Sequence, residues 1–160
     1  MPLSPIGVLH TLIGSAAIFC AIKLLWQKKQ ISFIPLLGKI YLLATLVTAV
    51  TALTIFKHGG FNAAHGLAVL TILAVLVGVV IEKTVIFKSW NKYAVNLCFS
   101  TTMLFHMIPT TTEILTRFPM DAPLVGSLED PLLQQSFLAV FIVYVIMLVL
   151  QMRWLGKQGS

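Results

Sequence analysis

Long runs of apolar residues, separated by short polar segments, dominate the pattern along this chain. None of the runs alternates between apolar and polar positions as a half-buried strand does. Each run is close to the roughly 20 residues that a helix needs to cross a bilayer, where backbone groups must pair within the helix. The pattern predicts an all-α integral membrane bundle with five transmembrane helices, at about Pro5–Trp26, Lys39–Phe56, Ala63–Ile81, Tyr93–Pro109 and Pro131–Trp154.

Residues that end and start helices mark the limits of these spans. Gly59 and Gly60 can end the second helix, and Asn62 can cap the third. Asp130 supplies a capping carboxylate and Pro131 a first helical position for the fifth.

The segment 110–130 is predicted as the one sizeable loop, on the outer side. Glu113 and Arg117 are spaced i,i+4 in the favourable order, so a short helical stub after Pro109 is expected. Because no linker or fixed-period repeat interrupts the chain, we predict one domain over residues 1–160.

The composition supports a membrane location. Hydrophobic residues make up 58% of the chain and charged residues 10%, against about 45–50% and 25% in ordinary globular proteins. So few charged side chains cannot cover a soluble globule. This composition excludes a disordered chain, a secreted disulfide scaffold and a nucleic-acid-binding module.

The positive charges predict the orientation. The formal net charge is +6, and most basic residues fall on one side of the five-span arrangement. Those residues are Lys23, Lys28, Lys29, Lys39, Lys83, Lys88, Lys92, Arg153 and Lys157. Because cytoplasmic loops carry the basic excess, we place the N-terminus outside and the C-terminus in the cytoplasm of a bacterial inner membrane. Trp26, Trp90 and Trp154 fall at the same interface, as anchoring indoles do.

The fourth span is the most polar one. At helical spacing, Asn96, Ser100, His106 and Glu113 share roughly one face, which is expected to point into the bundle rather than at lipid. Stripes of small residues on the first two spans predict close helix packing.

Four histidines, His10, His58, His65 and His106, are the strongest candidates for function. At 1.5 Å of rise per residue, all four lie roughly 21–28 Å above the predicted inner boundary, on four different helices. Each also has a structural explanation, as an interfacial residue, a helix-end partner or a turn hydrogen bond. Together they predict a shared site near the outer face.

Neutral imidazole binds zinc, copper or iron, including haem iron, which suggests two kinds of cofactor. A haem b would use two of the histidines, with Gly14 near His10 leaving room for the porphyrin. A non-haem zinc, copper or iron ion would use three or four of them. Glu113 is a further candidate ligand or proton carrier, with a surface ion pair to Arg117 as its structural alternative.

The two cysteines do not add to this site. Cys20 and Cys98 lie inside predicted spans, away from the histidines, and no CxxC motif is present. We expect both to be buried structural thiols.

The stretch from Gly38 to Gly78 resembles a bacterial family of small membrane proteins, the domain of unknown function 2306 type. The shared features are Gly38-Lys39-Ile40-Tyr41 at a helix start, Gly59-Gly60 at an outer turn and His65 at the next helix. The resemblance implies a multi-helix membrane fold and supplies no activity.

The function predicted from these features is a small membrane redox or metal protein. Its partners would be the lipid bilayer, a quinone or periplasmic redox protein and, as an option, further copies of itself. The alternative is a non-catalytic accessory subunit or a small-molecule transporter. The sequence leaves the choice between haem and another metal open.

Overall fold

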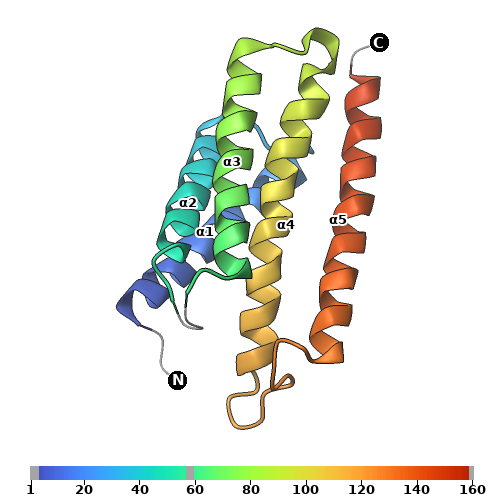
Figure 1. Ribbon diagram of the computed structural model, residues 1–160. Coiled ribbons are helices and arrows are strands. Elements are labelled where there is room, and N and C mark those ends of the chain that lie inside the picture. The colour runs from blue at the N-terminus through green and yellow to red at the C-terminus, as the bar shows by residue number, and fades with distance from the viewer. Residues whose placement is uncertain (1–3, 57–59, 159–160) are drawn as a thin grey trace.

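The computed structural model describes residues 4–56 and 60–158, and over these ranges the chain is helical without strands. Figure 1 shows α-helices that run mostly up and down in one bundle. They are α1 (Pro5–Lys28), α2 (Leu36–Ala52), α3 (Ala63–Thr84), α4 (Asn91–Arg117) and α5 (Pro131–Lys157), with a short 3₁₀ helix η1 (Lys88–Trp90) before α4. The prediction of an all-α bundle with five helices is confirmed.

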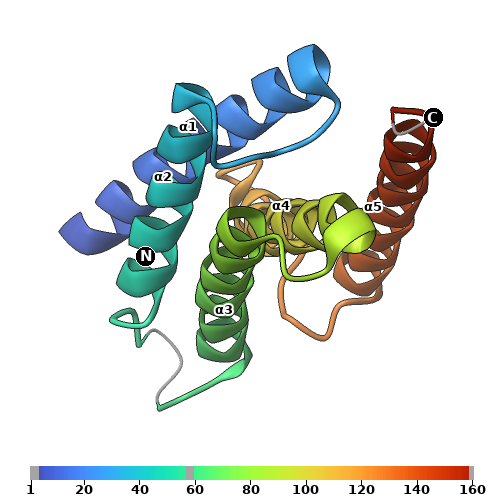
Figure 2. The ribbon, with the colours of Figure 1, turned by 90° about the horizontal axis from the view of Figure 1, so that it is seen from above.

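α4 occupies the middle of the bundle. It packs against α3 and α5, while α1 packs on α2 and α2 on α3. Figure 2 shows α1 crossing α2 obliquely, with α4 between that pair and α5. The most polar helix of the chain is therefore surrounded by apolar ones, as its sequence predicted.

Three helices have the length and composition of membrane spans among the described residues. They are α1, α3 and α5, whereas α2 is a shorter apolar helix of 17 residues. Large apolar side chains cover the outward surfaces of these helices, which is the composition of a surface in contact with lipid. These features are those of an integral membrane protein.

Two of the predicted helix starts are confirmed by their caps. The Asn62 side chain accepts from the Ala64 N–H at 3.0 Å, and the Asp130 carboxylate accepts from the Leu132 N–H at 2.9 Å. α2 ends earlier than predicted, at Ala52, because the Thr54 and Ile55 N–H groups bond only three residues back and close a turn. The predicted role of Gly60 as a helix end is therefore wrong, and Gly59 lies outside the described residues.

α4 does not end at Pro109 as predicted but continues to Arg117, so the loop between α4 and α5 covers 118–130 instead of 110–130. Proline removes one N–H from the helix ladder, which bends a helix without always ending it. Beyond it, Thr110 and Thr112 donate to the carbonyls four residues earlier. The predicted helical stub is thus an extension of the same helix.

Close contact between α3 and α4 depends on Gly78. A Cβ atom at this position would lie 2.5 Å from Phe99 Cε1 and 3.0 Å from Cys98 Cβ. Phe99 is fully buried, so its ring has little room to move aside. Small residues at such contacts let helix backbones approach each other in membranes.

A buried polar group joins α5 to the rest of the bundle. Gln151 Oε1 accepts from Ser100 Oγ at 2.8 Å and from Asn96 Nδ2 at 3.3 Å. Its Nε2 donates to the Lys29 carbonyl at 2.9 Å, just beyond the end of α1. One amide therefore ties α4, α5 and the α1–α2 connection together.

Substitution of Gly78 by alanine is expected to lower the free energy of unfolding by about 1–3 kcal/mol, because the added methyl overpacks the Phe99 contact. Gly66 on the same helix is the matched control, since a Cβ there meets nothing within 4 Å. Gly66→Ala should leave stability unchanged or raise it by about 1 kcal/mol. Thermal unfolding in detergent measures both, and equal effects would contradict this packing.

Candidate functional site

His106 is the candidate histidine of α4. Its side chain is buried, and Nε2 lies 3.0 Å from Thr45 Oγ1 of α2. Thr45 gives its single hydroxyl proton to the Tyr41 carbonyl at 2.8 Å. The Thr45 oxygen therefore accepts from the imidazole, which places the proton on His106 Nε2 and the lone pair on Nδ1.

A second hydrogen bond joins the same two helices one turn away. Tyr41 OH lies 2.6 Å from Thr102 Oγ1, and Thr102 donates to the Phe99 carbonyl at 2.7 Å. Because the Thr102 proton is used there, the phenol is the donor. Tyr41 and Thr102 are fully buried, so this bond fixes the position of α2 against α4 beside His106.

His10 of α1 has the same kind of hydrogen bond. Its Nδ1 lies 3.1 Å from Thr51 Oγ1, and Thr51 shares its own proton between the Val47 and Thr48 carbonyls, both at 2.9 Å. His10 Nδ1 is therefore the donor. His10 is also near enough to His106 for the two imidazoles to interact electrostatically.

The hydrogen bond of His65 on α3 has the opposite direction, because its ring nitrogen accepts instead of donating. Its Nδ1 accepts from the Asn62 N–H at 3.3 Å and completes the capping box at the start of α3. In the neutral ring, the proton is then on Nε2, which has no partner among the described residues. The ring is 1% exposed and lies beside Phe56 and Phe61, with centroids 4.7 and 5.4 Å away. This arrangement is that of a helix cap.

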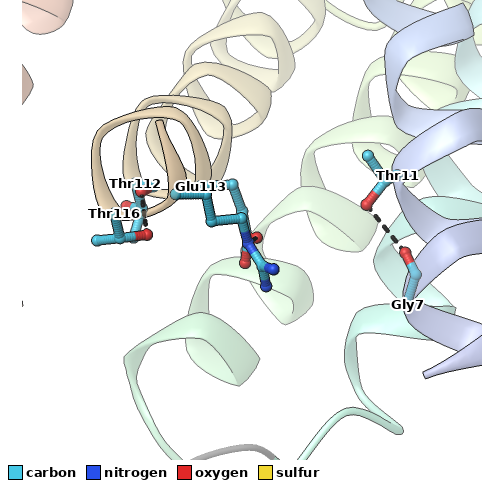
Figure 3. Close-up of polar contacts among 6 residues, drawn as sticks. Gly7, Thr11, Thr112, Glu113 and Thr116 are labelled. Carbon is cyan, nitrogen blue, oxygen red and sulfur yellow. Dashed lines mark hydrogen bonds and ion pairs between the residues drawn. The ribbon is translucent and has the colours of Figure 1, made fainter. Parts of the chain in front are cut away.

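Glu113 lies beyond His106 on α4, where its carboxylate pairs with the Arg117 guanidinium. Figure 3 shows Glu113 on the same part of α4 as the hydrogen bond from the Thr116 hydroxyl to the Thr112 carbonyl. The predicted surface pair is thus present. His58, the remaining predicted ligand, lies outside the described residues.

The histidines do not share one depth as closely as predicted. α3 and α4 are antiparallel and touch at Gly78 and Phe99. His65 is 13 residues (78 − 65) from that contact, about 20 Å, whereas His106 is 7 residues (106 − 99) away, about 10 Å. His65 therefore lies about two turns nearer the end of the bundle at which α3 begins and α4 ends. Among the described residues, no group of three or more His, Cys, Asp or Glu side chains converges.

The space beside Gly14, expected to accommodate a porphyrin, is occupied. A Cβ at Gly14 would lie 3.3 Å from Thr48 Cγ2 of α2. α1 and α2 are thus in direct contact next to His10.

The hydrogen bond between Thr45 and His106 was not predicted from the sequence. It joins residues 61 positions apart, so no local signal reveals it. A cavity of about 500 Å³ beside Glu82 was not predicted either. That carboxylate accepts from Ser32 Oγ at 2.5 Å and from the Phe33 N–H at 2.8 Å, and so holds the α1–α2 connection.

Comparison with known proteins gave no match: no family model, no curated protein and no solved structure is similar to this chain. The resemblance to the uncharacterised membrane family therefore stays a prediction. Any statement about function depends on the geometry above.

Thr45→Val keeps the shape of the side chain but leaves the His106 Nε2–H without an acceptor. The expected cost is about 1–3 kcal/mol of unfolding free energy, the usual penalty for a buried unpaired donor. Thr48→Val is the matched control on α2, since the Thr48 hydroxyl donates only to the Ala44 carbonyl of its own helix. Thermal unfolding in detergent should show a larger loss of stability for Thr45→Val than for Thr48→Val. Equal losses of stability would argue against the hydrogen bond between Thr45 and His106.

Proposed function

We propose that this chain is a five-span protein of a bacterial inner membrane, with its N-terminus outside and its C-terminus in the cytoplasm. The three long apolar helices support spanning, and α2 and α4 run alongside them in the same bundle. The basic residues at helix ends support the orientation. Lys28 ends α1, Lys83 lies in the last turn of α3 and Lys157 in that of α5, whereas the 118–130 loop carries three acids and no basic residue.

We further propose that the outer half of the bundle binds a redox-active or structural transition metal through His10 and His106. The observation that carries this proposal is the direction of their hydrogen bonds. Histidines that ligate metals almost always donate the other ring N–H to a protein acceptor, which fixes the tautomer. His10 does so through Thr51 and His106 through Thr45.

The same criterion assigns His65 a different role. Coordination through His65 Nε2 would move its proton to Nδ1, where it would face the Asn62 N–H and break the capping box. We therefore propose His65 as a structural residue and His10 with His106 as the ligands.

Copper, zinc and iron all accept imidazole ligands. The contact between Gly14 and Thr48 favours such a single ion over haem b, because a porphyrin needs a gap between helices. With copper or iron, the site would exchange electrons with a quinone or a periplasmic redox protein at the outer face. Two imidazoles leave coordination positions for further ligands.

The orientation is tested by single cysteines in a chain whose Cys20 and Cys98 are replaced by serine. Ser127→Cys in the outer loop should react with a membrane-impermeant maleimide on intact spheroplasts. Ser89→Cys in the α3–α4 connection should react only after permeabilisation, because it faces the cytoplasm. Both serines are exposed, so access to reagent alone decides the result. The reversed pattern would show the opposite orientation.

The cofactor is tested by elemental analysis and an absorption spectrum of the full chain purified after metal- and haem-replete expression. A stoichiometric transition metal is expected in the wild type, strongly reduced in His10→Gln and in His106→Gln. His65→Gln should retain it, because glutamine at this position preserves a capping box. A Soret band would identify haem instead. Wild-type protein with neither metal nor haem would favour the accessory role.

A further inference from the structure

A long apolar groove lies between the end of α1 and the second half of α5. Its volume is about 340 Å³, and its walls are Leu25, Val143, Ile146, Met147, Leu150 and Trp154, with Lys29 and Gln151 at one end. α1 and α5 are not packed against each other. The groove therefore opens on the lipid-facing side of the bundle.

We propose that this groove binds one anionic phospholipid, with an acyl chain along α5 and the phosphate beside Lys29. The leaflet is the one at the C-terminal ends of α1 and α5. This site is independent of the histidines.

The dimensions of the groove fit one leaflet. Val143 and Trp154 are 11 residues apart (154 − 143), which corresponds to about 16 Å along the helix. Half of a hydrocarbon core of about 30 Å is about 15 Å. An acyl chain that enters beside Trp154 would thus run along Leu150 and Ile146 to the depth at which its own leaflet ends.

Lys29 gives the polar end of the groove a positive charge, and no other side chain that lines the groove offers it an unused hydrogen-bond acceptor. The Gln151 amide is fully used by Asn96, Ser100 and the Lys29 carbonyl. The bond from Gln151 Nε2 to the Lys29 carbonyl and the left-handed backbone conformation of Lys29 together fix the backbone position from which the lysine side chain extends. Lys29 makes no salt bridge within the described residues. Trp154 beside it is a side chain typical of the headgroup boundary.

Charge complementarity identifies the lipid class. Basic pockets between membrane helices bind anionic headgroups, with about 1 kcal/mol for each basic residue near the surface. That value corresponds to roughly a five-fold preference for phosphatidylglycerol over phosphatidylcholine with the same chains. A second copy of this chain would bring another Lys29 to the same place and bury like charges together.

Native mass spectrometry of the full chain, titrated with each of these two lipids, tests the proposal. The wild type should retain phosphatidylglycerol about five-fold better than phosphatidylcholine. Lys29→Gln should abolish the difference, whereas Lys28→Gln, next to it but outside the groove, should keep it.

The apolar part is tested with tryptophan substitutions. Met147→Trp fills the groove and should weaken retention of both lipids, while Val149→Trp, on the exposed side of the same helix, should not. Circular dichroism confirms that each variant is folded. Equal retention of the two lipids by the wild type, equal effects of the two lysine variants, or a dimer lost only in Met147→Trp would each overturn the proposal.

Discussion

The polar face of α4 is the surface around which the other helices of this protein are arranged. In an apolar bundle every buried donor and acceptor must find a partner, because neither lipid nor apolar side chains can supply one. α4 meets that requirement on two sides. Thr102 and His106 bond to Tyr41 and Thr45 of α2, and Asn96 and Ser100 bond to Gln151 of α5. The central position of α4 follows from these bonds.

The hydrogen bonds of α4 and its neighbours also decide which chemistry each histidine can perform. A threonine hydroxyl that donates to its own helix can only accept from an imidazole, and this holds for Thr45 and Thr51. A backbone N–H can only donate, and this holds for Asn62 opposite His65. The same residue type is thus a hydrogen-bond donor to a threonine in two places and a helix cap in a third.

The two ends of the bundle differ in the polar groups that they contain. One end contains His10 and His106 with their threonine partners, between α1, α2 and α4. The opposite end carries most of the lysines, the Glu82 clamp and the polar mouth of the apolar groove. The proposed cofactor site and the proposed lipid site therefore lie in separate regions, and neither uses a residue of the other.

Much of the fold was predictable from local sequence. The five helices, the caps at Asn62 and Asp130 and the interior position of the fourth helix follow from hydropathy, capping chemistry and helical periodicity, which act over a few residues. The continuation of α4 past Pro109 was underestimated: proline removes only one N–H from the helix ladder, and the Glu113–Arg117 pair supports the helix beyond it. The early end of α2 was also missed.

The candidate site was predicted as a set of residues but not as an arrangement. The sequence by itself determined that His10, His65 and His106 belong to three different helices, since residue type and span position are local properties. Only the tertiary structure decided that His10 bonds to Thr51 and His106 to Thr45, that His65 caps α3 and that Glu113 pairs with Arg117. The physical reason is that a ring nitrogen's role depends on the atom opposite it. For His106 that atom belongs to Thr45, 61 residues away along the chain.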